Sequence, residues 1–279
     1  MREIEAKLIT DAVARLCIDA NTHLPEDMKD CICRFREAET WPQAQEILDR
    51  IVENYEIAAR DQMPVCQDTG MAVVFLKIGQ DVHICGDLEE AVNAGVRKGY
   101  GEGYLRKSMV RDPLDRVNTG DNTPAILHVE LVPGDKIEIT VAPKGFGSEN
   151  MSAIGMLRPS DGVEGVKAFV LKTVEEAGPN PCPPIVVGVG IGGTFEKAAY
   201  LAKKALLRPV DSSHEKPFYA ALEQELLEKI NALGIGPQGF GGRTTALAVN
   251  IETYPTHIAG LPVAVNISCH VTRHKTEVL

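Results

Sequence analysis

Residues 64–78 read PVCQDTGMAVVFLKI, and this stretch joins a polar turn to a mostly apolar run. The apolar run from Met71 to Ile78 predicts a buried strand. The turn before it places the thiol of Cys66, the amide of Gln67 and the carboxyl of Asp68 side by side, and proline and glycine bound it at its two ends. Because side chains in such a turn can face a ligand, we predict a functional site at the start of this strand.

Composition and charge exclude several classes of protein. With 44% hydrophobic and 24% charged residues, the 279-residue chain is an ordinary globular protein that can bury a large core. Its formal net charge of -10 argues against sequence-independent binding to nucleic acid or to an anionic membrane, since both need a basic surface. No apolar run reaches the roughly 20 residues of a membrane span, and no signal-peptide core follows Met1. We therefore expect a cytoplasmic protein.

The N-terminal part of the chain is predicted to be helical. Apolar side chains recur every four residues from Ile4 to Ala20, a second helix follows Pro25, and a third runs from about Pro42 to Arg60. None of these helices carries a catalytic constellation. We predict a single domain spanning residues 1–279, with a helical part up to about residue 62 and an α/β part after it.

Apolar strands alternate with helical patterns in the rest of the chain. The further predicted strands are 125–131, 136–142, 185–189, 244–251 and 261–267, and the further predicted helices are 88–99, 161–177, 194–207 and 217–233. The first two of these strands are joined by the turn VPGD, residues 132–135, as in a hairpin. This alternation predicts an α/β fold with a mixed, partly parallel sheet surrounded by helices, and with cysteine-bearing loops at strand ends.

The seven cysteines fall into groups with different expected roles. Their odd number and irregular spacing in a long chain do not suggest a disulfide framework. Cys17, Cys31 and Cys33 lie on or beside helix stripes, where a cysteine acts as a small hydrophobic residue. Cys85 ends a short apolar run and fits either role.

Cys66, Cys182 and Cys269 lie in polar turns at strand ends, with proline or glycine nearby. Loops at strand ends are where α/β proteins commonly build their sites. Three thiolates fit a zinc site or an iron-sulfur cluster with one iron not bound by protein. The absence of CxxC pairing favours the cluster, although the spacing alone leaves both possibilities open.

A glycine run offers an alternative function. Residues 188–193, GVGIGG, match the GxGxxG pattern of dinucleotide sites between a strand and a helix. The acidic residue at the required distance, Asp211, lies in a predicted loop and not at a strand end. We therefore predict tight strand-to-helix packing near a ligand, and keep a dinucleotide-dependent oxidoreductase as the alternative.

Two loops are suited to binding anions. Arg106, Arg111 and Arg116 lie in one of them, where a guanidinium can bind a carboxylate or can simply be solvated. The other loop, KGFGSEN at residues 144–150, can present backbone N–H groups to an anion.

Several segments resemble the signatures of class I, iron-sulfur-dependent fumarate hydratases. The matching segments are PVCQDTG around Cys66, NPCPP and VGVGIGGT around Cys182, KGFGSEN, GIGPQGFGGRTTAL at residues 234–247, and HIAGLPVAVNISCHVTRH from His257 to His274. The similarity runs from about Leu8 to Arg273. Within this family the chain is similar to the α subunit of the two-subunit form, and the tartrate dehydratase α subunit shares the same motifs.

The resemblance implies a hydro-lyase with a 4Fe-4S cluster. Cys66, Cys182 and Cys269 would each bind one iron and leave the fourth iron open as a Lewis acid. The expected reaction is the reversible hydration of fumarate to (S)-malate, a step of the tricarboxylic acid cycle. Dehydration of L-tartrate is the alternative.

The resemblance also assigns roles to substrate-binding residues. Asp68 matches the residue proposed to manage a proton, and Gln67 would hydrogen-bond the substrate. Arg106 would bind a substrate carboxylate, to which Gly145 or Gly147 could offer a backbone N–H. The fifth substrate-binding residue, His257, matches a histidine near the site.

A partner subunit is expected as well. In this family the residue that removes the proton from carbon belongs to a C-terminal domain, which a β subunit would supply here. The resemblance therefore implies an α2β2 assembly that binds a small dicarboxylate, and a chain with little or no activity by itself. A noncatalytic cluster-binding or scaffold subunit is the remaining alternative.

Overall fold

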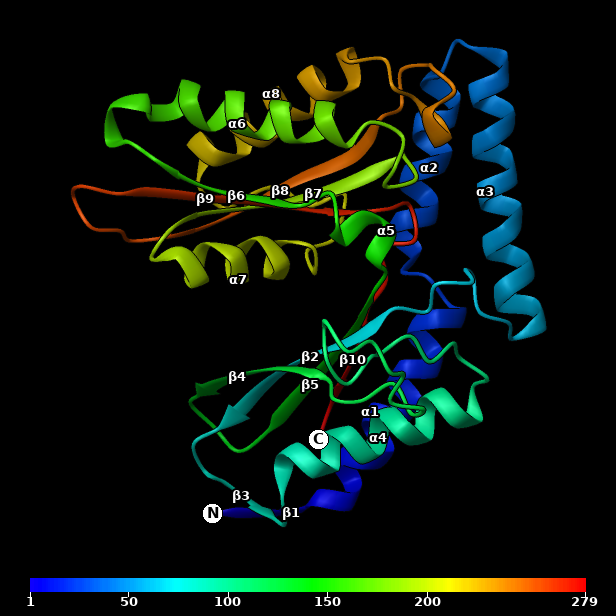
Figure 1. Cartoon of the computed structure of the whole chain (residues 1–279), viewed down its shortest axis with the longest axis vertical. Coiled ribbons are helices and arrows are strands. Elements are labelled where there is room, and N and C mark those ends of the chain that lie inside the picture. Colours follow the sequence, from blue (N-terminus) through cyan, green and yellow to red (C-terminus); the bar gives the residue numbers. More distant parts are fainter. The chain divides into compact units, whose positions relative to one another are not determined.

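The apolar run after the quoted turn forms strand β2 (Met71–Gly79), which is buried along most of its length. The computed structural model describes residues 1–279 (Figure 1). Its contacts divide the chain into two compact units. Unit 1 contains Met1–Pro25, Tyr55–Gly145 and Arg273–Leu279, and unit 2 contains Glu26–Asn54 and Phe146–Thr272.

Unit 1 is an α/β unit built on a mixed sheet. Its elements are β1 (Arg2–Glu5), α1 (Ala6–Thr22), β2, β3 (Val82–Cys85), α4 (Leu88–Glu102), β4 (Ile126–Val132), β5 (Ile137–Lys144) and β10 (Lys275–Val278), and the helix α3 (Pro42–Asp61) spans the boundary between the units in the chain. The strand order of the four-stranded sheet is β10-β5-β2-β4, while β1 and β3 form a separate parallel pair. β2 is parallel to β4 and antiparallel to β5.

The predicted strands β4 and β5 do not pair with each other, so the expected hairpin is not formed. β2 lies between them. The turn that joins them instead packs against the end of β2, where a Cβ on Gly79 would lie 2.3 Å from the carbonyl oxygen of Gly134. β2 is the most apolar of these strands and therefore takes the central position, which buries both of its faces.

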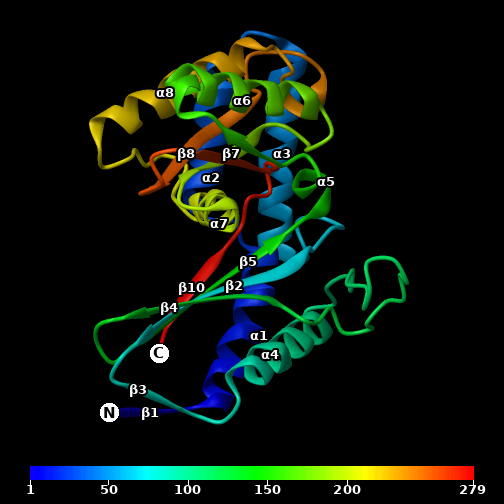
Figure 2. The same cartoon turned by 60° about the vertical axis from the view of Figure 1, so that its left-hand side comes forward.

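Helices α1 and α4 lie side by side against this sheet, and together they form the core of unit 1 (Figures 1 and 2). Two glycines of α4 permit the close approach of the helices. A Cβ on Gly95 would lie 2.7 Å from the carbonyl oxygen of Thr10, and one on Gly99 would lie 2.7 Å from that of Ala14. The large side chain of Tyr100 is fully buried in this core.

Unit 2 is a second α/β unit with its own core. Its elements are α2 (Glu26–Ala38), α5 (Phe146–Glu149), β6 (Ala153–Leu157), α6 (Gly162–Ala177), β7 (Ile185–Gly192), α7 (Phe195–Ala205), α8 (Pro217–Ala232), β8 (Ala246–Tyr254), β9 (Leu261–Ser268) and two short 3-10 helices, Pro159–Asp161 and Pro237–Gly239. The strand order is β6-β9-β7-β8, with β7 parallel to β8 and antiparallel to β9. Helices α6 and α8 cover one face of the sheet, and α7 covers the other (Figure 1).

These two units confirm the predicted α/β class, with mixed, partly parallel sheets surrounded by helices. The three predicted N-terminal helices are present as α1, α2 and α3. Four short strands (β1, β3, β6, β10) and the short helix α5 were not predicted, because a segment of four or five residues shows too little periodicity. The prediction of a single domain stays a prediction. None of the helices combines the length and apolar character needed to span a membrane.

The glycine run of residues 188–193 packs a helix tightly onto β7. Gly188 and Gly190 lie inside the strand, where their Cβ atoms would come within 2.2 Å of the carbonyl oxygen of Ala202 and 2.1 Å of that of Ala198 in α7. In a dinucleotide site the glycines form the turn between strand and helix. The predicted tight packing is therefore confirmed, and these two glycines do not form a phosphate-binding turn.

A buried carboxylate fixes the start of the segment that leads into β8. Glu39, which is 3% exposed, accepts hydrogen bonds from the N–H groups of Thr40, Trp41 and Arg243 and from the hydroxyl of Thr244, at 2.7–3.2 Å. Burial raises the pKa of Glu39, but the backbone hydrogen bonds outweigh it and hold this pKa below the ordinary value. Glu39 thus contributes stability above the unfolded-state pKa of about 4.3, and this contribution is lost as the pH falls through the folded-state pKa.

Replacing Glu39 with glutamine is expected to lower the free energy of unfolding at pH 7 by about 2 kcal/mol, because the amide NH2 cannot accept two of the four hydrogen bonds. At pH 3 the difference between variant and wild type should shrink. Urea unfolding at both pH values measures it, with Glu37→Gln on the exposed face of α2 as the control. A difference that grew toward low pH would contradict the prediction.

Candidate functional site

The turn that contains Cys66 and Asp68 lies where β2 begins and β5 ends, at one end of the strands of the unit 1 sheet. We call this end of the sheet the Asp68 edge. β2 begins at Met71, which pairs with Lys144 at the end of β5. β10 begins at Lys275, opposite Val141 of the same strand. The turn, Gly145 and the segment before β10 therefore meet at this edge.

Glycine is required at the end of the turn. Gly70 has a φ of +75°, and a Cβ there would lie 2.6 Å from the carbonyl carbon of Lys144. Its N–H donates a hydrogen bond to Asp68 Oδ1 at 3.0 Å. The backbone of the turn thus holds the carboxylate of Asp68 in one orientation.

The sulfur of Cys66 faces the backbone of the same turn. The N–H of Asp68 donates to Cys66 Sγ at 3.4 Å, and the Cys66 thiol donates to Gln67 Oε1 at 3.3 Å. The N–H of Asp68 and the amide of Gln67 thus fix the position of the Cys66 sulfur within the turn. Cys66 is half-buried and outside any disulfide, and Gln67 is exposed.

A buried tyrosine holds the main chain of the turn by hydrogen bonds. The hydroxyl of Tyr100 donates to the carbonyl oxygens of Thr69 and Gly70, at 2.9 and 3.0 Å. Burial raises the pKa of Tyr100, so its hydroxyl stays protonated and remains a donor.

Two predicted substrate-binding residues lie around the turn. Arg106 is exposed, and its guanidinium has no hydrogen-bond or ion-pair partner, while its carbonyl oxygen accepts a hydrogen bond from the Thr69 hydroxyl at 3.1 Å. Gly145 lies beside Asp68, because a Cβ on Gly145 would be 3.1 Å from Asp68 Oδ2. Unit 1 therefore brings Cys66, Gln67, Asp68, Arg106 and Gly145 to one edge.

Asn122 is a residue of this edge to which the sequence analysis assigned no role. It is fully buried with a φ of +64°. Its carboxamide accepts from the N–H groups of Ser108 and Met109, at 2.7 and 3.2 Å, and donates to the carbonyl oxygen of Gly70 at 3.1 Å. Asn122 thus connects the Arg106 loop to the Asp68 turn. The available signal was its place in the loop DNTP, since asparagine tolerates the left-handed region better than most residues.

Replacing Asn122 with alanine is expected to lower the free energy of unfolding by about 2 kcal/mol, because three hydrogen bonds to the backbone are lost. Asn122→Gly loses the same bonds but suits the positive φ, so it should be less damaging by about 1 kcal/mol. Urea unfolding measures both, with the exposed Asn118→Ala as the control. Equal stability of all variants would contradict the proposed link.

Unit 2 brings Cys182 and Cys269 to the same end of the strands of its own sheet, which we call the cysteine edge. Cys182 comes shortly before β7, and Cys269 directly follows β9. The two strands are antiparallel, and Val186 near the start of β7 pairs with Ser268 at the end of β9. Cys182 is exposed, Cys269 is half-buried, and neither forms a disulfide.

The loop that carries Cys182 is held by a glycine-rich segment. Cys182 has a φ of +55°, a backbone conformation that costs a non-glycine residue about 1–2 kcal/mol. Gln238 donates two hydrogen bonds to the carbonyl oxygen of Pro183, both at 2.8 Å, and a Cβ on Gly239 would overlap Pro179 at 2.3 Å. The segment GIGPQGFGG therefore serves as a support for the cysteine loop.

A polar network holds the end of β9 close to Cys269. Asn266 donates to Glu149 Oε2 and to Ser152 Oγ, each at 2.8 Å, and Glu149 also pairs with Lys203 of α7. Burial lowers the pKa of Lys203, although its ion pair with Glu149 opposes this. The predicted substrate-binding residue Gly147 is exposed in α5. A Cβ on Gly147 would lie 3.9 Å from the carbonyl oxygen of Asn180.

His257 lies at the other end of this sheet. It is exposed in the loop before β9, while Cys269 follows the end of the same strand. Eight residues of extended chain separate the two ends by about 26 Å. Unit 2 therefore does not bring His257 to the cysteine edge, and its role in substrate binding stays a prediction.

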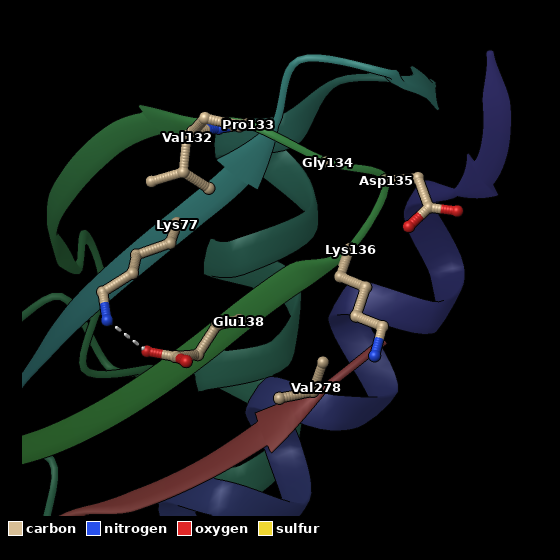
Figure 3. Close-up of a pocket in the computed structure, with 8 residues that line it drawn as sticks. All are labelled: Lys77, Val132, Pro133, Gly134, Asp135, Lys136, Glu138 and Val278. Carbon is tan, nitrogen blue, oxygen red and sulfur yellow. Dashed lines mark ion pairs between the residues drawn. The ribbon is translucent and has the colours of Figure 1, made fainter.

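The pocket drawn in Figure 3 is not part of these edges. It has a volume of about 480 Å3 and lies at the opposite end of β2 and β5 from the Asp68 turn. Lys77 and Glu138 point toward each other there and form an ion pair at 2.8 Å (Figure 3). With Lys136 and Asp135, which also line the pocket, the formal charges sum to zero, so the pocket has little attraction for a small diacid.

No group of three histidine, cysteine or acidic side chains within either unit is arranged to hold a metal ion. Cys66 belongs to unit 1, and Cys182 and Cys269 belong to unit 2. The chain thus provides two candidate sites, the Asp68 edge of unit 1 and the cysteine edge of unit 2.

Comparison with known proteins identifies the family. The family model described as "Fumarate hydratase (Fumerase)" matches residues 10–278. A Methanocaldococcus jannaschii protein provisionally named L(+)-tartrate dehydratase subunit alpha is 47% identical over 272 residues, which cover 95% of each chain. The L(+)-tartrate dehydratase subunit alpha of Escherichia coli strain UTI89 is 36% identical, and that of strain K12 is 35% identical, each over 96% of this chain and 89% of its own length. From a match that spans nearly the whole sequence, it follows that the chain belongs to the fumarate hydratase (Fumerase) family.

Proposed function

We propose that this chain is the α subunit of a hydro-lyase that removes water from L(+)-tartrate together with a β subunit. The relatives named above are α subunits of tartrate dehydratase, and an α subunit implies a partner subunit. The sequence analysis placed fumarate first and tartrate second, and these names favour the second substrate. The observation that carries the proposal is the position of the motif residues at one edge of each unit, in a chain of this family.

We propose that Cys66, Cys182 and Cys269 hold a 4Fe-4S cluster. The residues fit such a group: all three are accessible thiols at strand ends, and Cys66 Sγ already accepts a backbone N–H. When bound, a cluster with one iron not held by protein would supply a Lewis acid for a hydroxyl group.

The residues of unit 1 supply binding and proton transfer. Arg106, whose guanidinium has no partner in the chain, suits a carboxylate of the substrate. Gln67 can donate to a second oxygen of the substrate. Asp68, held by the N–H of Gly70, would give a proton to the hydroxyl oxygen that leaves.

The proposed reaction breaks a C–O and a C–H bond of the substrate, and it forms a C=C bond and an O–H bond of the released water. The C–O bond of one hydroxyl and the C–H bond of the neighbouring carbon break, and the C–H electron pair forms the C=C bond. The hydroxyl leaves as water after it receives a proton, and the enol product tautomerises to a keto diacid. The base that takes the proton from carbon is proposed to come from the β subunit.

The proposal is tested by assembling this chain with its β subunit without oxygen and supplying iron and sulfide. L(+)-tartrate, its stereoisomers, (S)-malate and fumarate are then compared by kcat/KM. We expect L(+)-tartrate to exceed malate and fumarate by at least about 100-fold, since buried polar groups discriminate strongly against a missing hydroxyl.

Three results would overturn the assignment to tartrate. A preference for fumarate and malate would restore the fumarate hydratase reading, and a change in nicotinamide absorbance would support an oxidoreductase. A complex that contains the cluster but turns over none of these diacids would indicate a noncatalytic subunit.

A further inference from the structure

Arg273 is a buried guanidinium at the Asp68 edge of unit 1. The residue is 5% exposed, and one of its terminal N–H groups donates to the carbonyl oxygen of Asp68 at 2.6 Å. Its Nε is buried without a hydrogen-bond partner, and Arg273 forms no ion pair. A buried positive charge therefore rests against the main chain of the predicted catalytic residue.

This arrangement is costly for the fold. A buried charge loses its hydration, and one hydrogen bond to a carbonyl oxygen offsets only part of this desolvation free energy. A neutral donor could make the same hydrogen bond at a lower cost. Polar groups that a protein keeps at such a cost are found preferentially at functional sites.

We propose that Arg273 is a positioning residue that holds the carbonyl of Asp68, and through it the orientation of the Asp68 carboxylate. The turn is held from two sides. The Gly70 N–H fixes the carboxylate at Oδ1, and Arg273 fixes the carbonyl of the same residue. Tyr100 holds the next two carbonyl oxygens, those of Thr69 and Gly70. Arg273 is thus the side chain that holds the main chain of Asp68 itself.

The charge of Arg273 also has a consequence for the site. The guanidinium places a positive charge beside the Asp68 turn, where it favours the binding of an anionic dicarboxylate. Lysine would keep the charge but would place a single ammonium in a different position from the guanidinium fork. Methionine would remove both the charge and the hydrogen bond.

This inference rests on the proposed function, and its test separates the two. Arg273→Met, Arg273→Lys and the control Arg60→Met, whose guanidinium pairs with Asp61 on the surface, are assembled with the β subunit. Arg273→Met should lower kcat about 100-fold with KM within threefold of wild type, since misplacing a catalytic group costs about this much. Arg273→Lys should recover part of kcat, and Arg60→Met should match wild type.

A second measurement uses the cluster-free chain alone. Amide hydrogen exchange of peptides covering residues 64–76 should become at least about tenfold faster in Arg273→Met, while peptides from β5 stay unchanged. If Arg273→Met does not fold, Arg273→Lys is used for both measurements.

The outcomes are distinguishable. A wild-type complex without dehydratase activity would overturn the proposed function. Amide hydrogen exchange of the Asp68 turn would then still test whether Arg273 holds this turn. Unchanged exchange in the variants, or an unchanged kcat in an active complex, would overturn the positioning role. A parallel loss of kcat and global stability in Arg273→Met that lysine does not recover would likewise overturn it.

Discussion

Replacing Asp68 with asparagine is expected to lower kcat of the assembled complex by about 1,000-fold and to leave KM within a few-fold of wild type. A positioned acid or base contributes about 100- to 10,000-fold to a rate. Asparagine keeps an oxygen that can accept from the Gly70 N–H, so the turn should keep its shape. What the variant loses is the ability to carry a proton.

The matched control for this variant is Asp112→Asn. Asp112 also binds backbone N–H groups of its own turn, those of Leu114 and Asp115, but it is exposed and has no proposed role in catalysis. Its pKa lies below the ordinary value because of these hydrogen bonds. Melting temperatures of both variants should stay within a few degrees of wild type. If Asp68→Asn retained a tenth or more of the wild-type kcat, Asp68 would not be the residue that transfers the proton.

Replacing Cys182 with alanine is expected to abolish both cluster binding and dehydratase activity. A cluster held by three thiolates loses one iron ligand, and no other cysteine follows Cys182 before Cys269. Alanine has the same preference against a positive φ as cysteine, so the backbone at φ +55° should be no more strained than in wild type. The variant therefore tests the sulfur and not the fold.

Iron and sulfide content and the visible absorption of the anaerobic complex measure the first effect, and turnover of L(+)-tartrate measures the second. Cys33→Ala, a half-buried cysteine on α2, is the control that should retain both. A Cys182→Ala complex with a full complement of iron and full activity would remove this cysteine from the site. Loss of activity with the cluster intact would assign Cys182 a role other than binding iron.

Many strands and helices of this protein could be predicted from local sequence patterns. The strand Met71–Ile78 was predicted nearly to its last residue, because a long apolar run bounded by turn residues has few other structures available. The amphipathic helices were predicted from apolar side chains that recur every three or four residues. Cys17 and Cys31, which were predicted to lie on helix stripes, are buried in helices, whereas Cys33 is half-buried, as Cys66 and Cys269 are.

Several features of the candidate site were not accessible in this way. Asn122 and Arg273 hold the Asp68 turn from positions 52 and 205 residues away along the chain. Their neighbours in sequence contain nothing that points to Gly70 or Asp68. Glu39 likewise reaches Arg243 across 204 residues.

Local patterns thus determined which segments became strands and helices and which thiols lie in turns, because burial and turn chemistry act over a few residues. Tertiary structure decided that β2 separates β4 from β5, that Cys182 and Cys269 share an edge of a sheet, and that His257 lies at its far end. Strand pairing and buried hydrogen bonds set these relations. Both join residues whose separation along the chain carries no periodic signal, so only the folded chain reveals them.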